Sequence, residues 1–123
     1  MRGFGELESA IMDRLWARDE PATVRELHTD LSEQRRLAYT TVLTVVDNLY
    51  KKGWLRREPA GRAYRYTPVT SRDEYSAGLM HEALDASGNP AAALLGLVGR
   101  MTPTEAAALR AALDSHGTGG ASR

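Results

Sequence analysis

The spacing of hydrophobic residues near the start of the chain predicts two amphipathic helices. The first is expected over residues 5–18, because its apolar residues recur every four positions and share one side of a helix. These residues are Leu7, Ile11 and Leu15. The second is expected over 23–34, after a break at Pro21. It opens with Thr23-x-x-Glu26, a capping box whose two side chains satisfy free backbone N–H groups of the first turn.

A third helix and a β-hairpin follow. The helix is expected over 39–52, with Gly53 at the position that favours a left-handed cap. Its apolar stripe consists of Val42, Val45, Val46 and Leu49. Two β-prone segments, 54–58 and 63–67, flank a Pro/Gly turn signal at 59–62, which predicts an antiparallel hairpin. This order is typical of a winged helix-turn-helix domain, so the predicted fold class is mainly α with a small β-hairpin.

Three more helices are predicted in the second half, over residues 72–87, 90–100 and 103–115. A start signal precedes each of them. The signals are Ser71 with Glu74, Asn89 with Pro90, and Thr102 with Pro103 and Glu105. Residues 116–123 are rich in Gly, Ser and Thr, and we expect them to form a disordered tail.

The C-terminal helices carry apolar residues that are too few and too one-sided to form a core of their own. Helices of about a dozen residues are also marginal in isolation. They need another surface, either on residues 1–70 of the same chain or on a second chain. The helix at 72–87 leads away from the first domain, so we favour a helical dimerisation region over 71–115. The expected interface residues are Leu79, Leu84, Leu94, Leu95, Leu97, Val98, Met101, Leu109 and Leu113.

Composition narrows the class of protein. The 123 residues suit one domain, or a small domain with an appendage. The chain has no cysteine, so it has no disulfide framework and no cysteine-based zinc site. There is no apolar run long enough to span a membrane, and the opening residues lack the apolar core of a signal peptide. We therefore expect a cytoplasmic protein without membrane insertion.

The net charge is zero, but the basic residues are concentrated in one part of the chain. Residues 35–66 hold eight Lys and Arg against two acidic residues, a net charge of +6, and the rest of the chain carries −6. A local positive field of this kind attracts a polyanion. Double-stranded DNA is therefore the expected partner, and residues 1–70 are the expected winged-helix DNA-binding domain.

The polar side of the third helix is unusual for a surface that meets only water. At 100° per residue, the side opposite the apolar stripe carries mainly threonines and a leucine. These side chains suit base edges and thymine methyl groups in a major groove. The candidate base-reading residues are Thr40, Thr41, Leu43, Thr44 and Asn48. The backbone N–H groups of Thr40 and Thr41 are expected to meet a phosphate, although Thr40 as the N-cap is an alternative. Asp47 is expected to pair with Lys51 one turn later, and the alternative is that it accepts a hydrogen bond from a cytosine N4 amine.

Seven residues near this helix and on the hairpin are candidates for DNA phosphate contacts. Lys51 and Lys52 also suit the negative end of the helix dipole. Arg62 and Arg65 have no comparable local reason to lie on the hairpin. The candidates are Tyr39, Arg35, Arg36, Lys51, Lys52, Arg62 and Arg65.

Other function classes have weaker support. The three histidines are scattered, and the chain shows neither a nucleophile–base–acid set nor a phosphate-binding loop. We therefore expect no enzyme activity, no catalytic residue and no cofactor. A metal site around His28 or His81 is a minor alternative. A winged-helix module that binds proteins instead of DNA, and a ligand-responsive regulator of the same architecture, also stay open.

Three sets of residues together resemble the penicillinase-repressor family (BlaI/MecI/CopY), and most of all its actinobacterial members. The sets are Ala38-Tyr39-Thr40-Thr41-Val42-Leu43-Thr44-Val45 with Leu49-Tyr50-Lys51-Lys52-Gly53, then Met12-x-x-Leu15-Trp16, then Gly61-Arg62-x-Tyr64-x-Tyr66-x-Pro68. The resemblance implies a homodimeric repressor whose winged helices bind the two halves of a palindromic operator. It also implies that Thr40, Thr41 and Thr44 read bases and that Arg62 braces the wing. The implied targets are β-lactamase or other stress-response genes.

The chain departs from the family pattern at three points. Asn48 stands where members often carry an arginine. Members that respond to β-lactams are cut by a membrane sensor-protease at an Asn-Phe bond, and the aligned bond in this chain is Gly96–Leu97. The copper-responsive branch uses C-terminal cysteines, which this chain lacks. The resemblance therefore implies a sensor-protease as partner and Gly96–Leu97 as the candidate cleavage bond, while the inducer stays open.

Overall fold

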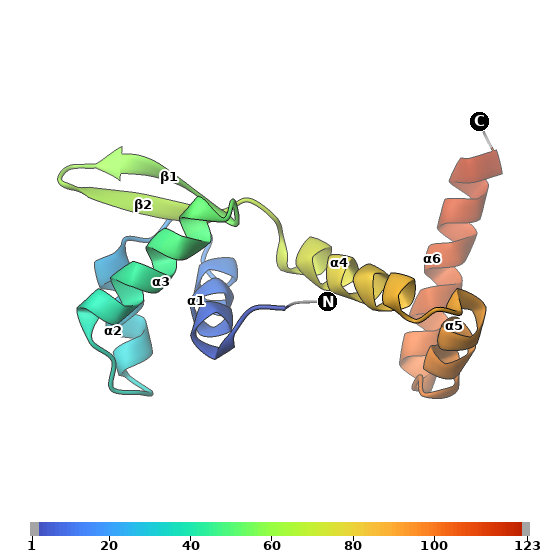
Figure 1. Ribbon diagram of the computed structural model, residues 1–123. Helices are drawn as coiled ribbons and strands as arrows, with labels where there is room; N and C mark the ends of the chain where they lie inside the picture. The colour runs from blue at the N-terminus through green and yellow to red at the C-terminus, as the bar shows by residue number, and fades with distance from the viewer. Residues whose placement is uncertain (1–2, 122–123) are drawn as a thin grey trace. The chain divides into compact units, whose positions relative to one another are not determined.

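The computed structural model describes the backbone of residues 3–121 and the side chains of residues 3–116. This range contains six helices and one two-stranded antiparallel sheet, in the predicted order. The elements are α1 (Glu6–Trp16), α2 (Val24–Ser32), α3 (Tyr39–Lys51), β1 (Leu55–Ala60), β2 (Ala63–Pro68), α4 (Arg72–Ala86), α5 (Pro90–Gly99) and α6 (Pro103–Ala121). Figure 1 shows the first three helices grouped together and the β1–β2 hairpin that follows α3. The mainly α fold with a small β-hairpin is confirmed.

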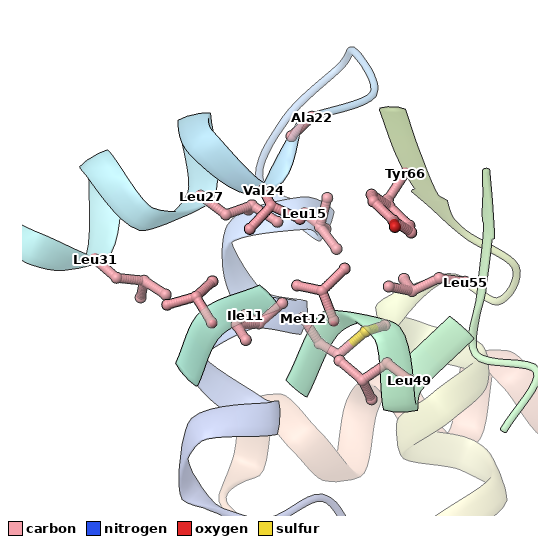
Figure 2. Close-up of a cluster of buried hydrophobic side chains, with 12 residues drawn as sticks. Ile11, Met12, Leu15, Ala22, Val24, Leu27, Leu31, Leu49, Leu55 and Tyr66 are labelled. Carbon is pink, nitrogen blue, oxygen red and sulfur yellow. The ribbon is translucent and has the colours of Figure 1, made fainter. Parts of the chain in front are cut away.

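One hydrophobic core joins α1, α2 and α3 to the hairpin (Figure 2). Removing this apolar surface from water is the main favourable contribution to the folding of the region. The core consists of Ile11, Met12, Leu15, Ala22, Val24, Leu27, Leu31, Val42, Val46, Leu49, Leu55 and Tyr66. Three of the four residues in the apolar stripe predicted for α3 are buried, whereas the fourth, Val45, is only partly buried.

The predicted start and stop signals act as expected. Thr23 Oγ1 accepts a hydrogen bond from the Glu26 N–H at 3.1 Å, and Glu26 Oε1 accepts one from the Thr23 N–H at 2.9 Å. Such a box satisfies two otherwise unpaired backbone donors. Gly53 has a φ of +91°, which confirms its left-handed conformation after α3. The same reciprocal bonds open α4 and α6, at Ser71 with Glu74 and at Thr102 with Glu105.

The hairpin turn is shorter than predicted. The strands pair up to Ala60 and Ala63, so the turn consists of Gly61 and Arg62 alone. Gly61 has a φ of +66° and the φ of Arg62 is not positive. This combination is that of a type II′ turn, whose twist matches the flanking strands. Pro59 lies inside β1 and not in the turn, because each strand of a two-stranded sheet is an edge strand and tolerates proline.

A third extended segment joins the sheet at a single residue. The Ala22 N–H donates to the Tyr66 carbonyl at 3.1 Å, and the Tyr66 N–H donates to the Ala22 carbonyl at 2.8 Å. Both residues are buried. The sequence around Pro21 indicated only a helix break, because a single bridge has no periodicity. The bridge ties the α1–α2 connection to the hairpin.

The chain divides into two compact units, residues 1–80 and 81–123. The division falls inside α4, whereas the boundary between the predicted DNA-binding domain and the predicted dimerisation region is at residue 70. Arg72 Nη2 lies 2.7 Å from Asp13 Oδ1 of α1, and the Tyr75 hydroxyl accepts a hydrogen bond from the Phe4 N–H. These contacts hold the first turns of α4 in the N-terminal unit. Leu79, a predicted interface residue, therefore belongs to that unit.

The second unit contains the end of α4, α5 and α6. Helix α6 continues to Ala121, so residues 116–121 are helical where a disordered tail was predicted. Propagating an existing helix adds one backbone hydrogen bond per residue, which offsets the poor helix propensity of this segment. Residues 122–123 lie outside the described range. Within that range, no helix is long and apolar enough to cross a membrane.

Candidate nucleic-acid interface

The predicted base-reading residues share the exposed side of α3. Val42, Val46 and Leu49 anchor the opposite side in the core. Leu43 is 41% exposed, and the neighbouring Tyr39, a predicted phosphate contact, is 42% exposed; both values are high for large hydrophobic residues in a helix. The other exposed members are Thr40, Thr41, Thr44 and Asn48. The fold therefore presents a row of small polar and apolar groups that a DNA groove can receive.

The hydroxyl of Thr44 has a defined orientation. Its Oγ1 donates to the Thr40 carbonyl, one turn earlier, at 2.9 Å. The donor is therefore used within the helix, whereas the oxygen lone pairs and the methyl group stay at the surface. Thr44 can accept a hydrogen bond from an exocyclic base amine or contact a thymine methyl group.

The start of α3 differs from the prediction in one respect. Ala38 is the N-cap and no side chain caps the helix, so Thr40 is not the N-cap. The Thr41 N–H donates to the Ala38 carbonyl at 3.1 Å. Thr41 therefore does not offer its N–H to a phosphate, because helical geometry already uses it. The Thr40 N–H keeps the position in the first turn from which phosphate is bound.

Asp47 and Lys51 form the expected pair, with Lys51 Nζ 2.9 Å from Asp47 Oδ2. The Lys51 side chain is 68% exposed, so the pair contributes at most ~0.5 kcal/mol to stability. The pairing partly neutralises Asp47, whose negative charge would otherwise repel a phosphate backbone.

Like Lys51, two further predicted phosphate contacts form ion pairs with acidic side chains of the protein. Arg35 Nη2 lies 3.4 Å from Glu6 Oε1, and Lys52 Nζ lies 3.2 Å from Glu8 Oε2. The pKa of Glu8 lies below its ordinary value, first because its carboxylate accepts a hydrogen bond from the Gly5 N–H and also because Lys52 is close. These ion pairs link α1 to the α2–α3 connection and to the C-terminal end of α3, contacts that periodicity does not reveal.

The remaining predicted cations lie at the surface. Arg36 is exposed in the α2–α3 connection, and Arg65 is exposed on β2. Arg62 is exposed at the tip of the hairpin, in the two-residue turn. Of these, Arg62 has the best access to a ligand that follows the edge of α3, because it also lines the groove described next.

A groove of about 470 Å³ runs between α3, the hairpin and the start of α2. Its walls combine aromatic and aliphatic side chains with two arginines. It is lined by Thr23, Val24, Arg25, Tyr39, Leu43, Arg62, Ala63, Tyr64 and Tyr66. Arg25 is not among the predicted site residues, and the 42% exposed Tyr64 appears there only within the wing motif. No local pattern assigns either residue to a groove, because only the fold brings α2 and β2 beside α3.

His28 and His81 each contact another group of the protein. His28 Nε2 lies 2.7 Å from the Leu37 carbonyl, which links α2 to the α2–α3 connection. His81 Nδ1 lies 3.5 Å from Asp85 Oδ2 in an exposed pair. In the part of the chain that the structure describes, no group of three or more His, Asp or Glu side chains is placed to hold a metal ion.

Comparisons with known proteins point in the same direction. The family model of the penicillinase repressor matches residues 4–115. The chain is similar to the transcriptional regulator BlaI of Mycobacterium tuberculosis (strain CDC 1551 / Oshkosh), with 51% identity over 113 residues, 89% of this chain and 82% of that protein. The protein of the same name from strain ATCC 25618 / H37Rv matches to the same extent.

Two solved structures have a similar fold. The first is the solution structure of the DNA-binding domain of the repressor BlaI, with a TM-score of 0.53 and 26% identity, covering 61% of this chain and 94% of that one. The second is the solution structure of Bacillus licheniformis BlaI in its monomeric form with the blaP half-operator. Its TM-score is 0.50 with 26% identity, covering 60% of this chain and 89% of that one.

Proposed function

The chain belongs to the penicillinase repressor family, and from this premise we propose that it represses transcription as a homodimer bound to a palindromic DNA operator. Membership makes it a transcriptional regulator of the BlaI type with a winged-helix DNA-binding domain, and not an enzyme. The proposal adds which residues bind DNA, how two chains assemble and which kind of gene is controlled. It also places the protein in the compartment that holds the DNA, which for its bacterial relatives is the cytoplasm.

The exposed side of α3 is the observation that carries the DNA-binding mode. The B. licheniformis relative was solved on a half-operator, and we transfer this mode to the present chain. Helix α3 enters the major groove, where Thr40, Thr41, Thr44, Leu43 and Asn48 face the bases. Arg62 contacts the DNA backbone from the hairpin, and Arg36 and Arg65 add positive charge at the edges.

A second chain is the proposed cover for the apolar surface of residues 81–116. The structure buries no residue of α5, and Leu95 is 75% exposed. Large apolar patches of this kind mark association surfaces. The other large exposed hydrophobic residues of this unit are Leu94, Leu97, Val98 and Leu113. Since a two-fold dimer presents two copies of α3, it matches an operator whose halves are related by the same symmetry.

Two routes would release the protein from DNA. Proteolysis at Gly96–Leu97 by a membrane sensor-protease would require α5 to open, because that bond lies inside the helix. A short helix that is not buried opens at low cost. The alternative is a small ligand that competes with DNA. β-lactamase genes or other stress-response genes are the proposed targets.

The test begins with selection of duplexes from a random library by the full chain. Fluorescence anisotropy then compares the selected duplex with a scrambled one at two salt concentrations. Thr41→Ala and Thr44→Ala are expected to lose ~1–3 kcal/mol of discrimination at one base pair and to leave scrambled binding unchanged. Arg62→Ala is expected to weaken binding to both duplexes and to flatten the log–log salt dependence by about one unit.

Thr29→Ala is a matched control for Thr44→Ala. Thr29 is an exposed helical threonine whose Oγ1 donates to the Arg25 carbonyl at 3.0 Å, as Thr44 does to Thr40. Its replacement is expected to leave discrimination unchanged. Equal effects of the two substitutions would contradict base reading by α3. A library from which no duplex is enriched would instead favour the protein-binding alternative, and binding of one chain per duplex would contradict the dimer.

A further inference from the structure

The hairpin carries an arginine on the side that faces the core. Successive residues of a strand point to opposite faces, and Arg57 pairs in register with the buried Tyr66. Arg57 therefore lies on the same face as Leu55, where an apolar residue is the usual choice. Its neighbour Arg56 lies on the opposite, exposed face. A charged group that is partly removed from water needs compensating contacts.

Two tyrosine rings provide these contacts. The Cζ atom of Arg57 lies 4.0 Å from the ring centroid of Tyr50 and 4.0 Å from that of Tyr64. A planar guanidinium between two rings gains cation–π attraction on both faces. Burial lowers the pKa of Arg57, but the hydrogen bond to Tyr66 and the neighbouring phenols outweigh it and raise the pKa. Like other arginines in proteins, Arg57 is therefore charged within this sandwich of Tyr50, Arg57 and Tyr64.

The sandwich adds side-chain contacts between three elements that already share backbone hydrogen bonds and the hydrophobic core. Tyr50 lies in the last turn of α3, Arg57 in β1 and Tyr64 in β2. Tyr50 also meets Tyr66 edge-on, with ring centroids 6.4 Å apart. Tyr64 lines the groove beside α3 and is two residues from Arg62. The position of the hairpin tip relative to α3 therefore depends on these rings.

We propose that Arg57 is a positioning residue for DNA binding: it holds the hairpin against the end of α3, so that Arg62 reaches the DNA backbone while α3 occupies the major groove. This inference rests on the proposed function and deepens it. In this proposal Arg57 acts through the position of the hairpin and not through a DNA contact of its own, since its guanidinium packs on two protein rings. A hairpin without the sandwich would have to be ordered on binding, which weakens association.

A double-mutant cycle tests the proposal on the selected duplex. Arg57→Ala is expected to weaken binding about tenfold, the loss that corresponds to removing two cation–π contacts. In that background, Arg62→Ala should have little further effect, because the tip is already misplaced. Arg56→Ala is the matched control, since it removes the same charge from the neighbouring position on the other face. The fold-losses in affinity caused by Arg56→Ala and by Arg62→Ala should multiply in the variant that carries both.

A second measurement needs no DNA. Hydrogen exchange of the β1 and β2 amides in the free protein is expected to be about tenfold faster in Arg57→Ala than in Arg56→Ala, since local opening follows the loss of the sandwich. Arg57→Lys keeps the charge and loses the planar stack, so it should also speed exchange. This variant keeps the test available if Arg57→Ala does not fold.

The outcomes separate the two proposals. Independent, multiplying effects of Arg57→Ala and Arg62→Ala would show that Arg57 contributes charge alone and would overturn the positioning role. Equal exchange rates in the Arg57 and Arg56 variants would overturn it as well. If the hairpin loosens as expected but no duplex is selected by the unmodified chain, the proposed function fails, and with it the placement of Arg62 on DNA.

Discussion

The backbone N–H of Phe4 donates a hydrogen bond to the hydroxyl of Tyr75 at 2.8 Å, although 71 positions separate the two residues. Their rings are stacked at a centroid distance of 4.3 Å with an interplanar angle of 7°. The Tyr75 ring also meets Trp16 and Trp54, each at 5.5 Å. The cluster joins the segment before α1, the end of α1, the start of the hairpin and the first turn of α4. It explains why α4 begins as part of the winged-helix unit.

The first prediction separates the hydrogen bond from the ring. Tyr75→Phe leaves the Phe4 N–H without its partner and is expected to lower the free energy of unfolding by about 1 kcal/mol. Tyr75→Ala also removes the stacking and edge contacts, so a loss of about 3 kcal/mol is expected. Urea unfolding followed by tryptophan fluorescence measures both, since Trp16 and Trp54 belong to the cluster. Equal losses in the two variants would show that the ring contributes nothing.

The second prediction compares two glycines. A Cβ at Gly53 or at Gly78 would meet no atom within 4 Å, so neither substitution creates a clash. Gly53 has a φ of +91°, and Gly53→Ala is expected to cost about 1 kcal/mol through backbone strain. Gly78 lies inside α4, and Gly78→Ala is expected to stabilise the chain by up to about 1 kcal/mol. Chemical denaturation of both variants measures the change in the free energy of unfolding. A change of the same sign in both variants would contradict this account.

The third prediction concerns acid stability. The pKa values of Glu8 and Glu26 both lie below the ordinary value of 4.5, mainly because backbone N–H groups of Gly5 and Thr23 donate to their carboxylates. A lowered folded-state pKa contributes stability above pH 4.5 that is lost as the pH falls through the folded-state pKa. The double variant with Glu8→Gln and Glu26→Gln is therefore expected to be less stable than the unmodified chain at pH 7.

The difference between the two proteins should shrink below pH 4.5, because protonation removes the same charges from the unmodified chain. Urea midpoints measured from pH 7 down to about pH 3 check this trend. A stability difference that stays constant over the whole range would mean that the carboxylate charges do not support the folded state.

The fourth prediction tests the apolar surface of the second unit. Leu95→Glu places a charge where a large hydrophobic residue is 75% exposed, and is expected to turn a dimer into a monomer. Gln34→Glu adds the same charge in the exposed α2–α3 connection and should leave the assembly unchanged. Sedimentation or light scattering at matched concentration reports the mass. A dimer that persists in Leu95→Glu and after removal of residues 89–123 would place the interface elsewhere.

Much of the architecture follows from local sequence alone. The period of apolar residues located the first three helices, and the boxes at Thr23, Ser71 and Thr102 located helix starts, because capping involves residues three positions apart. The angular spacing along α3 also identified its exposed threonines before any packing was known. These features are predictable because each depends on neighbours within one or two helical turns.

The tertiary structure decided which charges are available and what they do. Lys52 pairs with Glu8, 44 positions away, and Arg57 packs on rings from two other elements, so each has partners that the neighbouring sequence does not indicate. Two further contacts also join residues that are far apart in the sequence. They are the bridge between Ala22 and Tyr66 and the hydrogen bond between Phe4 and Tyr75. Such contacts join residues with no common period, so only the packing of the elements brings them together. The sequence by itself therefore determined the helices and the threonine side of α3, whereas the fold decided which arginines and lysines are paired with other side chains of the protein.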